Sequence, residues 1–200
     1  MSDNNQPDVG PYRQRFSQIA TMMRLPHVED AAGLDIAFAG VPFDMGVFFR
    51  PGARLGPSQI REMSRMLRAV HTASHVAPFD LCQVADVGDA PVNPMNVEGS
   101  IDRITDFFAD PAAKGVTPLA MGGCHTIPVP ILRDMKAGGA IAEPVAMIHL
   151  DAHADVLQTG PAFDGYEVNH GTFVRLAIEE RPGRSGPHGP GRFARHPVHV

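Results

Sequence analysis

The chain has 200 residues, a formal net charge of −5 and 44% hydrophobic residues. That apolar fraction can build the core of one domain, whereas the negative charge and the absence of a lysine or arginine run argue against a nucleic-acid surface. No apolar run approaches the ~20 residues of a membrane helix, and the polar first segment lacks the apolar centre of a signal peptide. With only two cysteines, too few for a disulfide framework, the composition predicts a soluble, cytoplasmic protein that binds neither nucleic acid nor membrane.

Buried strands alternate with amphipathic helices after an irregular arm over residues 1–30. The expected strands lie within residues 34–44, 80–89, 116–123 and 145–150, and the expected helices within 56–70, 97–110, 129–137 and 171–180. This alternation is typical of an α/β fold in which helices cover both faces of a mostly parallel sheet. The first helix carries an apolar stripe that predicts ordinary core contact, formed by Ile60, Met63, Met66, Leu67 and Val70.

The stretch VAMIHLDAHADV, residues 145–156, ends an apolar run in three polar side chains at every second position, Asp151, His153 and Asp155. Alternate residues of a strand share one face, but the outer two would lie ~13 Å apart in an extended chain. Metal–ligand bonds measure only ~2.0–2.2 Å, so the two aspartates can share an ion only if the chain curls after Asp151. Taken alone, the pattern leaves open a solvated loop that caps its own strand end.

Two further histidines occupy related positions. His125 directly follows an expected strand and a Gly-Gly turn, and His170 precedes Gly171 at the start of the last expected helix. Because ligands of open α/β sheets collect at the carboxyl ends of strands, His125 and the Asp-Ala-His-Ala-Asp cluster are expected to meet there. Carboxylates with imidazole suit Mn²⁺, Zn²⁺, Co²⁺ or Ni²⁺. His170 is either a capping residue or a proton carrier.

Four segments together resemble the ureohydrolase family of arginase and agmatinase relatives, and its agmatinase branch in particular. They read GVPFDMGVFFRPGARLGPSQIRE, GGCHTIPVPILR, IHLDAHADV and NHGTFVRLAIEE, and the likeness covers residues 34–180. The resemblance implies a three-layer α/β/α fold with a mostly parallel sheet. It also implies homo-oligomers, because family members assemble in that way. It also implies metal-dependent hydrolysis of a small guanidino compound, agmatine or a guanidino acid, to urea and an amine.

The same resemblance implies roles for individual residues. A pair of Mn²⁺ ions would sit at the strand ends, with Ni²⁺, Zn²⁺ or Co²⁺ as alternatives. His125 and Asp155 would serve one ion, His153 the other, and Asp151 would bridge them. His170 would match the proton-shuttling histidine of the family.

The chain departs from the family pattern in two places. Cys124 stands where the family usually has aspartate, and is either a small buried residue or a thiolate that favours a softer metal. After Glu180 nothing matches the later Asp-x-Asp motif or the acid that grips the guanidinium. Residues 31–180 are therefore expected to form the N-terminal portion of a ureohydrolase domain, with a sheet incomplete at its C-terminus and impaired activity. A non-catalytic fragment and an arginase-fold zinc deacetylase are the alternatives.

Residues 181–200 differ from the rest because they are rich in Arg, Pro, Gly and His and show no periodicity. One interpretation is a disordered basic tail. The other is a frameshift. A GC-rich coding sequence, with its synonymous codons freely chosen, can encode GLVDPARMVQVG in one frame. After the gain of one base it encodes RPGRSGPHGPGR, which is the sequence of residues 181–192. The hidden frame would continue the α/β pattern, so a frameshifted tail is the favoured hypothesis.

Overall fold

The computed structural model describes residues 4–8, 10, 13–137, 146–160 and 166–180. The tail over 181–200, to which the frameshift hypothesis applies, and Val145 lie outside the described residues.

The described residues form a three-stranded sheet in the order β2-β1-β3, with β1 (Ile36–Val41) paired in parallel to both neighbours. Ile36 lies opposite Val84 of β2 (Val84–Asp89) and opposite Thr117 of β3 (Thr117–Gly122). Strand β1 is central and almost wholly buried, as its run of apolar and small residues predicts. The parallel sheet expected from the sequence is thus confirmed.

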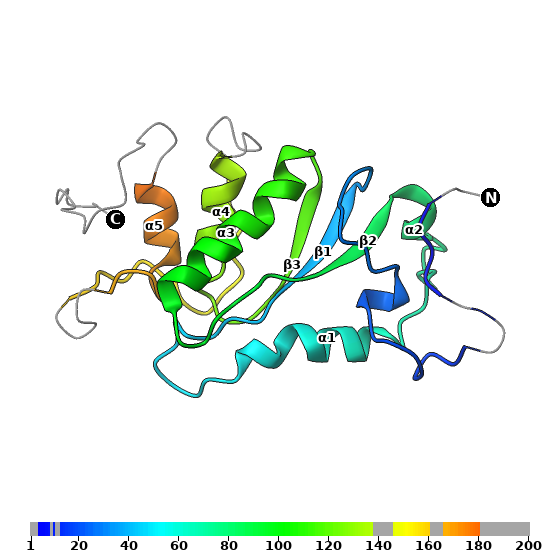
Figure 1. Cartoon of the computed structure of the whole chain (residues 1–200), viewed down its shortest axis with the longest axis horizontal. Coiled ribbons are helices and arrows are strands. Elements are labelled where there is room, and N and C mark those ends of the chain that lie inside the picture. The colour runs from blue at the N-terminus through cyan, green and yellow to red at the C-terminus, as the bar shows by residue number, and fades with distance from the viewer. Residues whose placement is uncertain (1–3, 9, 11–12, 138–145, 161–165, 181–200) are drawn as a thin grey trace.

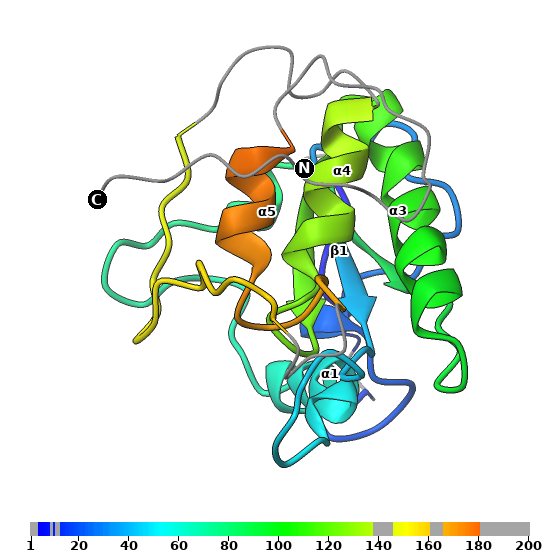
Figure 2. The same cartoon turned by 90° about the vertical axis from the view of Figure 1, so that its left-hand side faces the viewer.

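Helices cover both faces of this sheet, which confirms the three-layer α/β/α architecture. Helix α1 (Gly56–Ser64) lies on one face, and α3 (Val97–Ala113) and α4 (Pro128–Ala137) lie on the other (Figure 1). Helix α5 (Phe173–Glu179) packs beside α4 (Figure 2). The short elements are η1 (Met22–Arg24), η2 (Ala53–Leu55) and α2 (Pro78–Leu81). The strand expected from Asp80 begins only at Val84, because α2 occupies the preceding residues.

The strand order reverses between β1 and β3. From β1 the chain first crosses over α1 to β2, and it then returns over α3 to β3 on the other side of β1. Right-handed crossovers in opposite directions place their helices on opposite faces, as observed. The carboxyl ends of β1 and β3 therefore flank a topological switch point, which is where open α/β sheets bind ligands.

The fourth strand predicted over 145–150 is not found, and this prediction was wrong for the described residues 146–150, which belong to no strand. Ile148 and Leu150 are 88% and 91% exposed. A strand needs a neighbour to pair its backbone N–H and C=O groups, and no described strand lies alongside this segment. The apolar run indicated burial, but burial requires a partner that the described residues do not supply.

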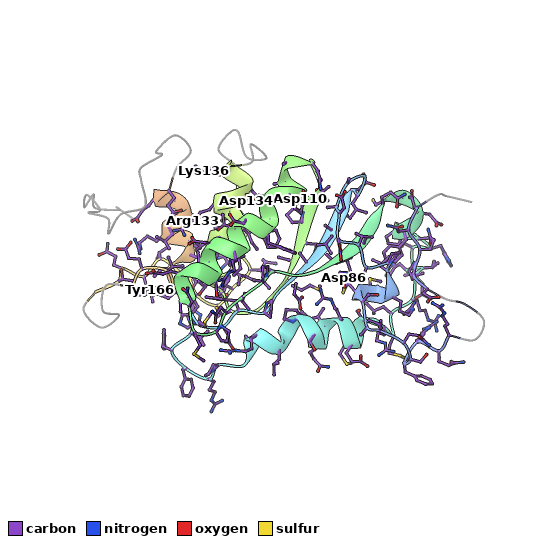
Figure 3. All side chains as sticks on the ribbon, viewed as in Figure 1. Asp86, Asp110, Arg133, Asp134, Lys136 and Tyr166 are labelled. Carbon is purple, nitrogen blue, oxygen red and sulfur yellow. The ribbon has the colours of Figure 1, made fainter. Side chains whose placement is uncertain are left out.

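The first helix also differs from prediction, because it ends at Ser64 and its buried side is polar. Pro57, Arg61 and Ser64 face the sheet, and Arg61 is neutralised there by Asp86, which is labelled in Figure 3. The expected core stripe is instead partly or largely exposed, at Ile60, Met63, Met66, Leu67 and Val70. A buried ion pair has replaced the apolar contact that periodicity predicted.

The main hydrophobic core lies between the sheet and α3, where Val41 and Phe43 meet Ile104 and Phe108. The irregular arm packs against the β2 edge of the sheet. Leu25 of the arm is buried, and His27 forms a bridge to Asp86 of β2. No helix in the described part of the chain is long and apolar enough to cross a membrane.

Candidate metal centre

His125 follows β3 on a turn that is fastened to the end of β1. The Cys124 N–H donates to the carbonyl of Phe43 at 2.7 Å, continuing the contact between the two strands. Gly123 has a φ of 85°, and a Cβ there would come within 2.4 Å of the Val41 carbonyl oxygen. Only glycine allows this close approach, so the Gly-Gly pair fixes where His125 leaves the sheet.

Asp155 is turned back toward His125 by a curl in the backbone. Its φ of 51° lies in the left-handed region, which aspartate tolerates better than most residues. The Asp155 carbonyl accepts hydrogen bonds from the backbone N–H groups of Val174 (3.2 Å) and Arg175 (3.4 Å) at the start of α5. Helix α5 thus holds the curl that the sequence required if the two aspartates were to share an ion.

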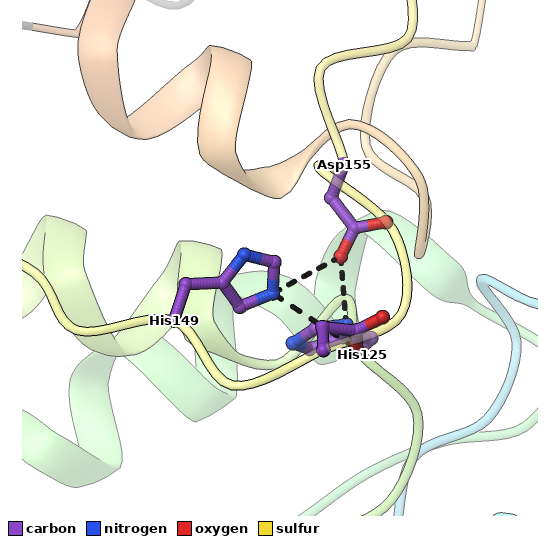
Figure 4. A group of neighbouring side chains, drawn as sticks. His125, His149 and Asp155 are labelled. Carbon is purple, nitrogen blue, oxygen red and sulfur yellow. Dashed lines mark ion pairs between the residues drawn. The ribbon is translucent and has the colours of Figure 1, made fainter.

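Four side chains meet at the switch point: His125, His149, Asp151 and Asp155. One ligand atom from each lies within 4.8 Å of all the others. The Asp155 Oδ2 atom is 2.9 Å from His125 Nδ1 and 3.5 Å from His149 Nε2. The Asp151 Oδ2 atom is 3.3 Å from His125 Nδ1 and 3.9 Å from His149 Nε2. Figure 4 shows both imidazole rings directed toward the Asp155 carboxylate.

Two of these ligand atoms are buried and lack hydrogen bonds within the described part of the chain, Asp155 Oδ2 and His149 Nε2. The Asp155 side chain is only 8% exposed. A buried carboxylate without a hydrogen bond or a full cationic partner is costly, whereas a divalent ion between these atoms would satisfy all of them. The donor set therefore fits a metal ion of borderline softness.

An aromatic side chain packs against both histidines of the cluster. The Phe173 ring lies with its centroid 4.4 Å from that of His125 and 5.1 Å from that of His149. In the same cluster, the backbone N–H of His153 donates to Asp151 Oδ1 at 2.8 Å. This hydrogen bond, more than any other contact, holds the pKa of the Asp151 carboxyl below its ordinary value.

Three of the four ligands predicted from the sequence are brought together, and His153 is not among them. Its side chain is 82% exposed, with Nδ1 3.4 Å from Asp151 Oδ1, and its role at a second ion stays a prediction. Sequence reasoning missed His149. Two signals pointed to it, since it interrupts an apolar run and lies two residues before Asp151, on the same face of an extended segment.

His170 lies against the loop that follows β1. Its backbone N–H donates to the Gly46 carbonyl at 3.2 Å, and its ring meets Phe48 edge-on, with centroids 4.4 Å apart. Its half-buried ring precedes by three residues the Phe173 that contacts the cluster. Its role as proton carrier stays a prediction.

Sequence reasoning also missed Asp44, which organises the same loop. The buried Asp44 carboxylate accepts hydrogen bonds from the Arg54 side chain (Nε, 2.6 Å) and the Gly52 N–H (2.6 Å). The hydrogen bond from Arg54 holds the pKa of Asp44 below its ordinary value. The loop beside His170 is therefore fixed from within.

Cys124 is buried in the main hydrophobic core with Phe43 and Ile127 and is not part of the four-residue cluster. The structure thus agrees with the interpretation of Cys124 as a small buried residue.

Known proteins provide an independent comparison. The model of the Arginase family matches residues 34–185. Guanidinopropionase from Pseudomonas aeruginosa is 41% identical over 90% of this chain and 54% of its own length. Guanidinobutyrase from the same organism is 43% identical over 88% of this chain and 54% of its own length.

The solved structure of proclavaminate amidino hydrolase from Streptomyces clavuligerus is also similar. It superimposes with a TM-score of 0.75 at 36% identity, over 84% of this chain and 54% of that one. The chain therefore spans about half the length of the relatives that it matches.

Proposed function

Because the chain belongs to the arginase family, we propose that its domain hydrolyses a small guanidino compound to urea and an amine with the help of divalent metal ions. The family is metal-dependent, and the observation that carries the proposal is the buried, hydrogen-bond-deficient cluster of histidine and aspartate at the switch point of the sheet. A guanidino acid is the favoured substrate class, because two similar relatives bear the names guanidinopropionase and guanidinobutyrase.

Mn²⁺ is the proposed metal, since mixed carboxylate and imidazole ligands suit it, although Zn²⁺, Co²⁺ and Ni²⁺ can compete for such donors. His125, Asp151 and Asp155 would hold one ion. His153 lies on the exposed side of Asp151, and these two residues would hold a second ion.

The proposed reaction would combine a bound ion with roles for the chain's own side chains. A divalent ion held there would supply a nucleophile by lowering the pKa of water toward ~7. The carboxylates of Asp151 and Asp155 would hold the ion, while the Phe173 ring, packed against His125 and His149, would keep the two imidazoles in place. His170 would donate a proton to the departing nitrogen, which leaves as a neutral amine.

The test is urea release by the purified full chain, measured with and without Mn²⁺, from 3-guanidinopropionate, 4-guanidinobutyrate and agmatine. We expect Mn²⁺-dependent formation of urea and the matching amine at a lower rate than guanidinobutyrase shows, since in the described residues His153 stands outside the cluster. Asp155→Ala should abolish it.

Two outcomes would contradict the proposal. One is acetate release from an acetylated amine without any urea, which would indicate a deacetylase. The other is a metal-loaded chain that releases no urea from any of the three compounds, which would indicate a non-catalytic fragment.

A further inference from the structure

We propose that His149 is a direct ligand of the tightly held metal ion, through Nε2, and closes a four-ligand site with His125, Asp151 and Asp155. This inference rests on the proposed metal-dependent function and adds a residue to its site.

The spacing of the donor atoms fits a single ion. Two ligand atoms bound to a tetrahedral ion at ~2.1 Å are about 3.4 Å apart. His149 Nε2 lies 3.5 Å from Asp155 Oδ2 and 3.9 Å from Asp151 Oδ2, close to that separation. The remaining donor, His125 Nδ1, lies 2.9 Å and 3.3 Å from the same two oxygens.

The nitrogen itself needs a partner. His149 Nε2 is buried and makes no hydrogen bond within the described residues, although two carboxylate oxygens lie near it. If Nε2 is unprotonated, its lone pair repels those oxygens. If Nε2 carries a proton, the separations of 3.5 Å and 3.9 Å are too long for a good N–H···O bond. A cation bound between the nitrogen and the oxygens turns the repulsion into three favourable contacts.

The backbone aims His149 inward. Residues 148–150 alternate in the manner of an extended chain, with Ile148 and Leu150 outward and the His149 side chain only 20% exposed. The Phe173 ring packs edge-on against the His149 ring, with an interplanar angle of 88°, and so limits its rotation. The ring is therefore held in the orientation that a ligand requires.

The test is Co²⁺ and Mn²⁺ binding to the metal-free full chain, followed by calorimetry and by the visible absorption of bound Co²⁺, with no need for turnover. His149→Ala and His149→Asn should weaken binding by at least about tenfold and shift the Co²⁺ spectrum, because a nitrogen ligand is lost. His71→Ala removes an imidazole from an exposed loop and should leave both readouts unchanged. Circular dichroism would verify that each variant is folded.

The outcomes separate this inference from the function beneath it. If His149→Ala keeps the affinity and spectrum of the unaltered chain, His149 is not a ligand. The same conclusion follows if His153→Ala loses the ion and His149→Ala does not. In both cases the proposed function stands. If the unaltered chain binds neither metal, the site and the inference both fail. Loss of binding in His149→Ala with urea release intact in the unaltered chain supports both.

Discussion

Two buried aspartates on opposite sides of the central strand have different surroundings. Asp86 of β2 is 1% exposed. Its two carboxylate oxygens accept hydrogen bonds from Nε (2.7 Å) and Nη2 (2.9 Å) of Arg61. Asp155 is also buried, yet its ion-pair partners within the described part are two histidines, and its Oδ2 has no hydrogen bond. The comparison teaches that the fold supplies its own cation on the β2 side, whereas on the β3 side we propose that the cation is a metal ion from solution.

The backbone shows the same difference. Strand β2 is buried over its first three residues, whereas β3 is mostly exposed or half-buried and buries only Met121. Beyond the carboxyl end of β3, the apolar segment 146–150 pairs with no described strand. Among the described residues, the β3 side, which carries the candidate site, is therefore less buried than the β2 side.

The largest expected effect comes from removing the internal cation. Arg61→Ala would leave Asp86 buried without its charge partner, so we expect the free energy of unfolding to fall by about 3–5 kcal/mol. Urea denaturation followed by circular dichroism would measure it. Arg13→Ala is the control, because Arg13 pairs with Asp8 on the exposed arm and should cost only about 0–1 kcal/mol. Equal losses in the two variants would contradict the contrast between buried and exposed pairs.

A somewhat smaller effect is expected from supplying the external cation. Mn²⁺ at about 100 times its dissociation constant should raise the free energy of unfolding by about 2.7 kcal/mol. In Asp155→Asn this gain should vanish, while the metal-free protein should be no less stable than the parent because a buried charge has been neutralised. Thermal unfolding with and without the ion measures both quantities. A gain that persists in Asp155→Asn would place the ion elsewhere.

Acid should weaken the β2 side. Although burial alone would raise the pKa of Asp86, the hydrogen bonds from Arg61 hold that pKa below its ordinary value. A lowered folded-state pKa gives stability that is present above the unfolded value, ~3.9, and is lost as the pH falls through the folded value. Urea unfolding should show this loss below about pH 4, and the slope there should be shallower in Arg61→Met. Identical slopes would contradict the assignment.

The smallest effect is expected in the unpaired segment. Leu150→Ser should change the free energy of unfolding by no more than about 0.5 kcal/mol, because the side chain is already exposed. Ile104→Ala, in the main core, should by contrast cost about 2–5 kcal/mol. Chemical denaturation of the pair would test it, and a large loss in Leu150→Ser would mean that the segment is buried in solution.

The sequence predicted what local pattern controls and failed where distant partners decide. Alternation predicted the parallel sheet with its covering helices, and the Gly-Gly turn before His125 predicted the strand-end site. The strand over 145–150 could not be judged, because an apolar run does not reveal whether a neighbour is present to pair with it. Helical periodicity likewise favoured Ile60 and Met63 for the core, since nothing local shows that Asp86 would draw Arg61 inward instead.

Helix α5 touches the candidate centre in two ways, through the backbone N–H groups that hold the Asp155 carbonyl and through the Phe173 ring under both histidines. An ion that pulls Asp155 and the two rings together must also favour the docked position of this helix. Because such coupling is reciprocal, any change that loosens α5 from α4 should weaken metal affinity by the same free energy by which the metal secures the helix. A residue far from the proposed ligands, such as Leu176 in the contact with α4, is therefore expected to influence the metal affinity of the candidate centre.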